Sequence, residues 1–213
     1  MNQGRFITFE GGEGGGKSTQ LRRLTERLSG AGQEVVATRE PGGSPGAEAI
    51  RDLLVRGAAD RWSAMTETLL MYAARRDHVE RVIGPALARG AWVLCDRFAD
   101  STRAYQGAAG GTDPAFIAAL ETHVLDGVRP DLTLILDLPP EAGLARAASR
   151  AGAETRFESK GEAFHGRLRQ AFLDIAASEP ERCVVIDATQ PLDAVSLSIW
   201  SALEDRLGAA PRG

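Results

Sequence analysis

Short apolar runs alternate along this chain with longer segments in which apolar residues recur every three or four positions. Each run has the length of a buried strand. The runs are residues 5–9, 34–38, 92–96, 131–137 and 182–187. Between the first two, Leu21, Leu24 and Leu28 mark one face of a helix. This alternation predicts an α/β fold: a five-stranded parallel sheet with helices on both faces and ligands at the carboxyl ends of the strands.

Residues 65–89 predict one long helix, which Pro85 is expected to bend. Asp137, at the end of the fourth run, is expected to cap the next helix rather than to act as a Walker B acid. The expected buried stripe of the long helix is Leu69, Tyr72, Ala73, Val79, Val82 and Ile83.

Composition limits the partners of the protein. A length of 213 residues suits one α/β domain, and the net charge of −4 argues against binding to nucleic acid. Cys95 and Cys183 lie inside apolar runs, as free core cysteines of a reducing compartment do. The sequence contains no apolar run of membrane-spanning length and no leader-like N-terminus. We therefore expect a cytoplasmic protein without membrane contact.

Residues 11–18 (GGEGGGKS) fill the phosphate-loop pattern G-x-x-x-x-G-K-S between a strand and a helix. Glycines let backbone N–H groups surround a phosphate, and the helix N-terminus adds to that field. Lys17 is expected at the outer phosphates of ATP and Ser18 at Mg²⁺. The alternative, an ordinary glycine-rich turn, does not explain the flanking strand and helix. The predicted ATP-binding residues are Gly11, Gly12, Glu13, Gly14, Gly15, Gly16, Lys17, Ser18 and Thr19.

Two arginines, Arg39 and Arg97, follow two different predicted strands. Arginine binds phosphate through paired hydrogen bonds, so they indicate a second phosphorylated substrate, although a surface salt bridge is the alternative for each. The only asparagine is Asn2, so the chain lacks both the guanine-reading motif of GTPases and the catalytic-loop asparagine of protein kinases. Both classes are excluded.

Several motifs together carry a specific resemblance. Residues 9–19 (FEGGEGGGKST), 38–43 (TREPGG), 94–106 (LCDRFADSTRAYQ) and 134–141 (LILDLPPE) resemble the motifs of the thymidylate kinase family. The resemblance extends from residue 6 to about residue 190. It implies a P-loop NTPase fold of the nucleoside monophosphate kinase type, transfer of a phosphoryl group from ATP to dTMP with Mg²⁺, and a homodimer.

The resemblance also implies roles for single residues. Arg39 and Arg97 are expected to hold the dTMP phosphate, Glu13 to lie near the sugar and the metal, and Tyr105 to crowd the ribose 2′ position. By their position at strand ends, the carboxylates Glu10 and Asp96 could orient either the waters of the metal or the two arginines, and Asp96 is favoured near the metal together with Ser18. The expected substrate-binding residues are Glu13, Arg39, Met71, Arg75, Arg97, Ser101, Tyr105 and Gln106.

At the base, Arg75 is expected to bond the thymine, and Ser101 and Gln106 to complete the pocket. Family members commonly place a phenylalanine four residues before this arginine, where the present chain has Met71. Either the thioether of Met71 packs on the base or neighbouring Tyr72 turns in.

An arginine-rich segment at about residues 146–160 predicts a mobile lid, with a solvated helix face as the alternative. Arg150 is expected on a helix face, and Arg156 follows a glycine break and could swing in from a loop. Some family members carry an arginine where this chain has Gly14, whereas bacterial-type members place the catalytic arginine in the lid. Alanine at either lid position is expected to collapse turnover while dTMP binding survives. The expected catalytic residues are Lys17, Arg97, Arg150 and Arg156.

Two other functions remain open from the sequence: a kinase for another nucleoside or nucleoside monophosphate, and a noncatalytic ATP-binding regulator. The adenine of ATP is expected near residues 188–191, after the last strand.

Overall fold

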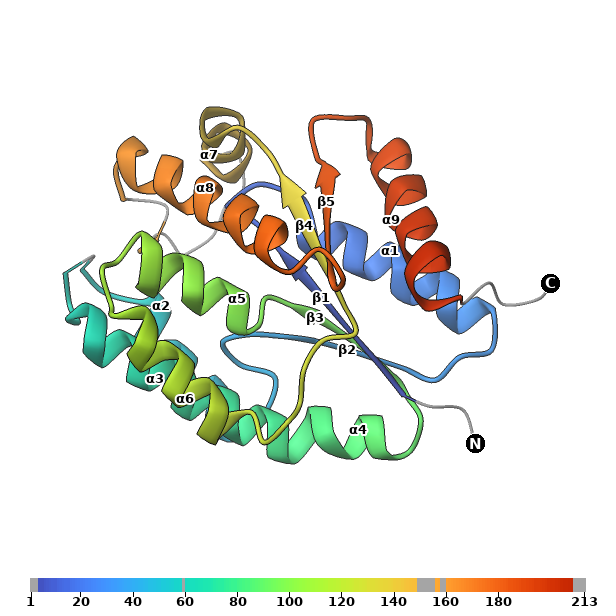
Figure 1. The fold of residues 1–213 in the computed structure, drawn as a ribbon, viewed down its shortest axis with the longest axis horizontal. Helices are drawn as coiled ribbons and strands as arrows, with labels where there is room; N and C mark the ends of the chain where they lie inside the picture. The colour runs from blue at the N-terminus through green and yellow to red at the C-terminus, as the bar shows by residue number, and fades with distance from the viewer. Residues whose placement is uncertain (1–3, 59, 149–155, 158–159, 209–213) are drawn as a thin grey trace.

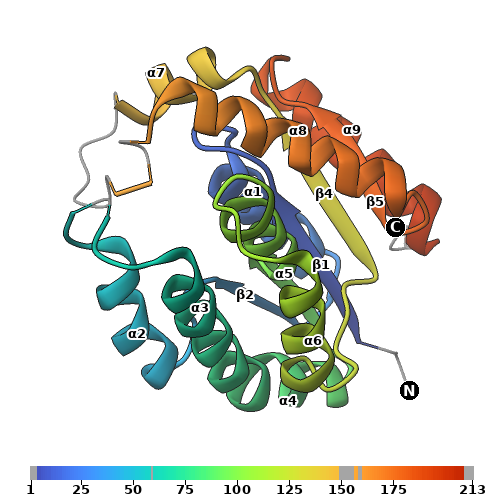
Figure 2. The same ribbon diagram turned by 60° about the vertical axis from the view of Figure 1, so that its left-hand side comes forward.

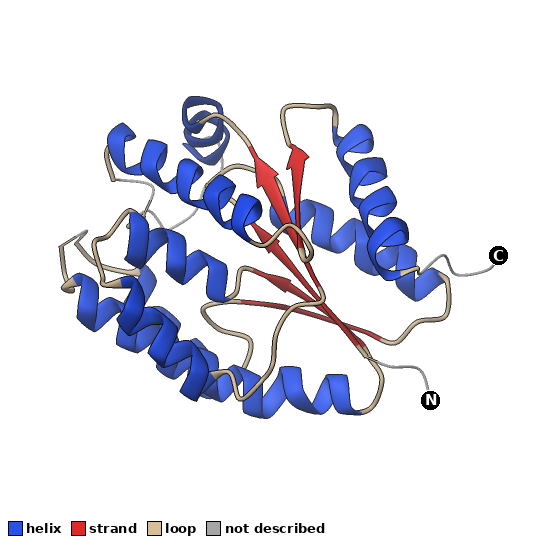
Figure 3. Cartoon of the chain, in the orientation of Figure 1, coloured by secondary structure: helices blue, strands red, loops and turns tan. Residues whose placement is uncertain are grey.

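Five parallel strands form one sheet in the order β2-β3-β1-β4-β5 in the computed structural model (Figures 1 and 3). The structure describes residues 4–58, 60–148, 156–157 and 160–208. Every strand starts and ends within one residue of its predicted position, which confirms the predicted sheet. The strands are β1 (Arg5–Glu10), β2 (Val35–Arg39), β3 (Trp92–Asp96), β4 (Leu132–Asp137) and β5 (Cys183–Asp187).

Helices connect the strands and cover both faces of the sheet (Figure 2). They are α1 (Lys17–Gly30), α2 (Pro45–Val55), α3 (Ala64–His78), the π-helical turn η1 (Val79–Ile83), α4 (Gly84–Ala88), α5 (Ala99–Thr102), the π-helical turn η2 (Arg103–Ala108), α6 (Pro114–Val124), α7 (Pro140–Ala148), α8 (Glu162–Ser178) and α9 (Leu192–Leu207).

The two faces of β1 bury different kinds of side chain. Ile7 and Phe9 pack in the apolar core with α1 and α9. Successive residues of a strand point to opposite faces, so Thr8 and Glu10 face the other layer, where both are fully buried. The Glu10 carboxylate therefore lies inside the protein at the carboxyl end of the central strand.

The predicted long helix is present, although its buried stripe differs from the prediction. α3 continues through η1 into α4, and this π-helical turn begins six residues before Pro85, which lies in the first turn of α4. Leu69 and Ala73 are exposed, while Met71 and Ala74 are buried. Apolar residues occupy several sides of this helix, so periodicity alone does not select the buried side.

Neither cysteine forms a disulfide: Cys95 and Cys183 are buried free thiols on β3 and β5. Among the described helices, none is both long and apolar enough to cross a bilayer.

Candidate active site

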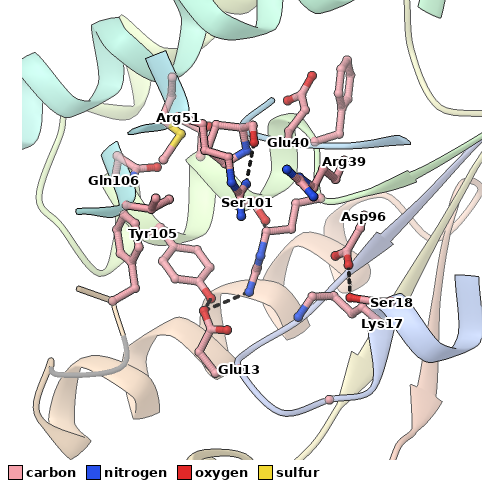
Figure 4. A pocket seen from close by; sticks show the side chains of 18 of the residues that line it. Glu13, Lys17, Ser18, Arg39, Glu40, Arg51, Asp96, Ser101, Tyr105 and Gln106 are labelled. Atoms are coloured by element: carbon pink, nitrogen blue, oxygen red, sulfur yellow. Dashed lines mark hydrogen bonds and ion pairs between the residues drawn. The ribbon is translucent and has the colours of Figure 1, made fainter. Parts of the chain in front are cut away.

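Three neighbouring strands end at the same edge of the sheet, because Phe9 and Arg39 both pair in register with Asp96. The loops after these strands line a cleft of about 390 Å³ (Figure 4). All eight expected substrate-binding residues line this cleft. They are joined there by Gly14, Gly15, Gly16, Lys17, Ser18 and Asp96. Residues separated by up to 93 positions in the chain are thus brought together in one cleft.

The glycine loop shapes one end of the cleft. Gly14 has a φ of 69°, and a Cβ atom there would lie 2.0 Å from the carbonyl oxygen of Gly143, so only glycine fits. Gly16 caps α1 without a side-chain hydrogen bond, which leaves the first N–H groups of the helix available to an anion. Lys17 Nζ donates to the carbonyl oxygens of Gly12 (2.6 Å) and Gly11 (3.2 Å). Burial, reinforced by a neighbouring guanidinium, lowers the pKa of Lys17 to about 8.

Two oxygen ligands suited to Mg²⁺ lie beside this loop. Ser18 Oγ donates to Asp96 Oδ2 at 2.6 Å, and hard cations prefer such hydroxyl and carboxylate oxygens. Glu10, the alternative carboxylate, has both oxygens engaged inside the protein, by Phe98 N at 2.7 Å and Ser101 Oγ at 2.6 Å. The geometry therefore favours Asp96 over Glu10 near the metal.

Arg97 follows β3 in a left-handed conformation, with a φ of 70°. Its Nη1 donates to Ser101 Oγ at 3.2 Å and its Nη2 to Glu13 Oε1 at 3.0 Å. Glu10 fixes the turn that follows Arg97, because its carboxylate accepts hydrogen bonds from Phe98 N and Ser101 Oγ. Left-handed backbone at a non-glycine residue costs about 1–3 kcal/mol and persists only where neighbours hold it. The fold thus fixes this guanidinium inside the cleft.

Glu13 connects Arg97 with the aromatic wall of the cleft. Its Oε1 also accepts from the Tyr105 hydroxyl at 2.7 Å (Figure 4). Burial alone would raise the pKa of Glu13, but Arg97, Lys17 and Tyr105 outweigh burial and lower it to about 2. The carboxylate is therefore ionised and neutralises part of the positive charge of the cleft.

Arg39 is held much more loosely than Arg97. Its side chain is 55% exposed, and Nη2 lies 3.1 Å from Glu48 Oε2. Glu48 also accepts from the backbone N–H of Gly43. An exposed ion pair of this kind contributes about 0–1 kcal/mol, so Arg39 can exchange Glu48 for a phosphate at little cost.

Arg75, which also lines the cleft, is almost fully buried. Its Nε donates to Glu40 Oε2 at 2.7 Å, and its Nη2 donates to Phe98 O and Thr102 Oγ1 at 3.0 Å each. The remaining nitrogen, Nη1, is buried and has no hydrogen-bond partner among the described residues. A buried donor without a partner is rare in proteins, and in a cleft it indicates a ligand contact.

Met71, rather than Tyr72, lines the cleft. The Tyr72 ring instead lies 4.8 Å from the Arg75 guanidinium, and its hydroxyl donates to Glu121 Oε1 at 3.1 Å. Gln106 is held in the cleft wall by Glu67, whose Oε1 accepts from Gln106 Nε2 at 2.7 Å. Of the two side chains, Met71 is thus the one that faces the cleft.

The sequence analysis missed several residues that line the cleft. They include Glu40, Pro41, Arg51, Val55 and Phe157. The first two belong to the TREPGG motif, which contained the signal needed to find them. Arg51 and Val55 lie on α2, which reaches the cleft only through tertiary packing, and nothing local marks them. The ring of Phe157 meets that of Tyr105 edge-on at 5.6 Å, so an aromatic side chain does line the cleft, from a part of the chain other than position 71.

The predicted lid lies partly outside the described residues, and Arg150 falls there. The position of Arg156 differs from the expectation of a loop residue that swings toward the phosphates. Its guanidinium is buried, donates to Leu54 O (3.0 Å) and Ala58 O (3.1 Å), and forms an ion pair with Glu67. It lies against α2 and α3 because Glu67 is a buried carboxylate that requires a partner.

Two further predictions concern the ends of β4 and β5. Asp137 does not cap α7, which begins three residues later; both of its oxygens accept from Arg169 of α8, at 2.7 and 2.8 Å. The turn at residues 188–191 lies directly after β5 as expected, and Arg146 of α7 donates to the carbonyl oxygen of Ala188 at 3.2 Å.

Two anion-binding regions in one cleft of a five-stranded parallel sheet place this chain among the P-loop kinases whose acceptor already bears a phosphate. The family model described as thymidylate kinase matches residues 9–199. The thymidylate kinase of Caulobacter vibrioides is 70% identical over 208 residues, which cover 98% of this chain and 100% of the relative. That of Nitrobacter winogradskyi is 58% identical over 96% of this chain and 90% of the relative.

A solved structure agrees. The crystal structure of thymidylate kinase from Ehrlichia chaffeensis superposes with a TM-score of 0.77 at 36% identity, covering 94% of this chain and 98% of that one. The chain belongs to the thymidylate kinase family.

Proposed function

We propose that this protein transfers the γ-phosphoryl group of ATP to dTMP and releases dTDP and ADP. The observation that supports it most directly is the shared cleft, in which the glycine loop and Lys17 face Arg39 and Arg97. One nucleotide enters from each end, and their phosphates meet between these groups. Family membership supplies the identity of the acceptor.

ATP occupies the glycine loop in this proposal, with its phosphates at the N-terminus of α1 and its adenine near residues 188–191. The Ser18 hydroxyl and the Asp96 carboxylate are oxygen ligands of the kind Mg²⁺ prefers, so these two residues would hold it. When bound, the ion neutralises phosphate charge and fixes the geometry of the phosphates. Lys17, now bonded to two loop carbonyls, exchanges those carbonyls for phosphate oxygens.

dTMP occupies the other side of the cleft. Arg39 and Arg97 hold its phosphate, Tyr105 and Glu13 border its sugar, and Arg75 reaches the base. Met71 forms the apolar floor, because a thioether packs well against a ring face. Ser101 and Gln106 complete the wall.

The acceptor itself explains why no catalytic base is assigned. A phosphate monoester with a second pKa near ~6 is mostly dianionic at neutral pH and needs no proton removed before it attacks. The difficulty is repulsion between two anions, which the cationic side chains must offset while they hold the reacting oxygens in line. Positioning and electrostatics therefore carry the reaction.

We further propose that the segment at about residues 146–160 acts as a mobile lid and that Arg150 is its catalytic arginine. Arg156 is better suited to anchor the lid, because its buried ion pair with Glu67 would have to break before it could reach a phosphate. An arginine inserted at transferring phosphates contributes about 10³ to 10⁵ in rate.

The two lid arginines should behave differently when replaced. Arg150→Ala should lower kcat by about 10³, leaving thermal stability and dTMP affinity near wild type. Arg156→Ala should also lower turnover, but with a loss of about 3–5 kcal/mol in the free energy of unfolding, since Glu67 is left buried without its charge partner. Steady-state kinetics and urea unfolding separate these outcomes. Near-normal turnover in both variants would remove the lid from the mechanism.

A homodimer is also proposed. Leu53 of α2 and Met65 and Leu69 of α3 are 39%, 44% and 47% exposed, and α3 packs between α2 and α6 (Figure 2). An exposed apolar group of this kind on one side of a protein marks an association surface. A cytoplasmic location follows from the proposed substrates, and the acidic net charge gives no reason to expect a nucleic-acid partner.

The proposed activity is tested by measuring ADP release with dTMP, dUMP, UMP, dCMP, AMP and thymidine as acceptors. dTMP should give the highest kcat/KM, and Lys17→Ala should abolish turnover. Preference for thymidine would indicate a nucleoside kinase, and preference for another monophosphate would change the assigned base. ATP binding without ADP release on addition of dTMP would indicate a regulator, and activity retained in Lys17→Ala would contradict the proposed mechanism.

A further inference from the structure

A buried chain of hydrogen bonds lies behind the base end of the cleft and connects β2 with α3. His78, at the end of α3, is fully buried. Its Nδ1 lies 2.9 Å from Glu40 Oε1, and its Nε2 lies 2.7 Å from Thr38 Oγ1. The other oxygen of Glu40 accepts from Arg75 Nε at 2.7 Å. We call His78 and Glu40 the His78–Glu40 clasp.

The chemistry of the clasp indicates which group donates to Glu40. An ionised carboxylate only accepts hydrogen bonds, so the proton lies on His78 Nδ1 and is donated to Glu40. Nε2 lies within hydrogen-bond distance of the Thr38 hydroxyl, which can donate to the ring or accept from it. Both Glu40 oxygens therefore have a donor, as a carboxylate with a side chain only 4% exposed requires.

Glu40 determines how the Arg75 guanidinium is oriented. The group is planar, so a bond at Nε and two at Nη2 leave Nη1 a single direction. The rings of Tyr72 and Phe98, centred 4.8 and 5.2 Å from the guanidinium carbon, restrict movement out of the plane. Nη1 is the one Arg75 nitrogen without a partner among the described residues. A small rotation of Glu40 would therefore move the donor that is left for a ligand.

Glycine at position 43 keeps the clasp compact. A Cβ atom there would lie 2.4 Å from His78 Nε2 and 2.5 Å from Thr38 Oγ1. The loop between β2 and α2, which begins beside Arg39, therefore packs directly on the imidazole. The clasp holds the end of β2 and the inner side of α3 in one arrangement.

We propose that His78 is a positioning residue for the acceptor nucleotide: acting through Glu40, it fixes the direction in which Arg75 Nη1 meets the base. His78 itself does not line the cleft, so it touches no substrate. The inference rests on the proposed function, in which Arg75 reads the base of dTMP.

Two substitutions at one position separate the two bonds of the ring. An asparagine amide reaches about as far as Nδ1 and a glutamine amide about as far as Nε2. His78→Asn therefore keeps the donor to Glu40 and loses Thr38, whereas His78→Gln keeps Thr38 and loses Glu40. We expect His78→Gln to raise the KM for dTMP about tenfold, the effect of losing a hydrogen bond to a charged group. We expect His78→Asn to remain within about threefold of wild type, and both to leave the KM for ATP unchanged.

A double-mutant cycle tests the route through Arg75. A residue that acts only through Arg75 has nothing left to position in Arg75→Ala, so His78→Gln should not raise the dTMP KM further in that background. His123→Gln, at an exposed histidine of α6, is the matched control and should not alter either KM. Calorimetric titration with dTMP measures the same ratios as dissociation constants.

Equal dTMP affinities for His78→Asn and His78→Gln, or a rise in the KM for ATP alongside that for dTMP, would overturn the proposal in favour of general packing. If His78→Gln does not fold, Thr38→Val replaces it: this variant keeps the bond to Glu40, so a tenfold rise in its dTMP KM would equally contradict the proposal. Absence of wild-type activity with dTMP would instead refute the proposed function. The ratio of the dTMP dissociation constant of a His78 variant to that of the wild type tests the clasp independently of turnover.

Discussion

At the scale of single residues, the site depends on carboxylates placed where water cannot reach them. Glu10 is fully buried at the end of β1. Burial, with a smaller effect from Asp100, raises the pKa of Glu10 from 4.5 to about 7, although Ser101 and Arg97 act in the opposite direction. A negative charge on Glu10 therefore lowers the stability of the folded state. The same carboxylate fixes the turn beside Arg97.

This arrangement predicts a pH-dependent stability difference. Because the folded-state pKa of Glu10 lies above the unfolded-state value, its contribution to stability is fully present below pH 4.5 and is lost as the pH rises through about 7. Glu10→Gln does not titrate. The free energy of unfolding of the wild type, relative to that of Glu10→Gln, should therefore fall between pH 4.5 and pH 8 in urea titrations. A difference that is constant or rises with pH would contradict the raised pKa.

Which residues could be found from the sequence depends on where their partners lie. Lys17, Ser18 and Arg97 belong to continuous motifs, so their neighbours along the chain already indicate their chemistry. Nothing in the sequence near His78 indicates its role, because its partner Glu40 lies 38 positions away. Arg156 was expected at the phosphates, because the charge pattern of the sequence does not show that Glu67 holds this arginine in a buried ion pair.

At the scale of secondary-structure elements, the glycine loop and α7 meet backbone to backbone. A Cβ atom on Gly143 would lie 2.4 Å from the carbonyl oxygen of Glu13. This contact joins the first helix of the proposed lid region to the phosphate loop. Both contacting groups are backbone atoms, which cannot rotate away as a side chain can. A methyl group added at this contact must therefore displace the loop or the helix.

Gly143→Ala should therefore impair ATP use more than dTMP binding. Misplacing reacting groups by about 1 Å can cost about 10²-fold in rate, so we expect kcat/KM for ATP to fall by about that factor while dTMP affinity stays near wild type. Gly166→Ala is the matched control, because a Cβ atom at that α8 position meets nothing within 4 Å. Steady-state kinetics for both substrates would decide the matter. Equal behaviour of the two variants would show that the loop tolerates the displacement.

Elements were easier to predict than their packing. The central strands β1, β3 and β4 are short apolar runs that are buried almost throughout. The edge strands β2 and β5 are partly exposed but are still mostly apolar runs, so hydrophobicity locates all five. The orientation of α3 was predicted wrongly at Leu69 and Ala73, since Met71 and Ala74 are equally apolar and pack inward instead. Which side of α3 is buried depends on its packing against α2, α6 and the cleft, and the sequence of α3 alone does not show these contacts.

At the scale of the whole molecule, α3 has two roles on opposite sides. Met71 and Arg75 line the cleft, while Met65 and Leu69 are exposed. A second copy of the chain bound to the exposed side would hold α3 from outside, just as the His78–Glu40 clasp holds it from inside. The proposed homodimer would thus stabilise the helix that carries the base-binding residues.

Leu69→Glu tests this arrangement. A carboxylate buried in an apolar interface without a partner costs several kcal/mol, and each 1.4 kcal/mol corresponds to about tenfold in the dissociation constant. We therefore expect sedimentation to show a wild-type dimer and a Leu69→Glu monomer at the same concentration. Leu197→Glu is the control, because Leu197 is 65% exposed on α9, away from α3, and this variant should remain dimeric. A monomeric wild type, or equal dissociation of both variants, would show that α3 is not the contact surface. If the dimer supports α3 as argued, Leu69→Glu should also raise the KM for dTMP while leaving that for ATP unchanged.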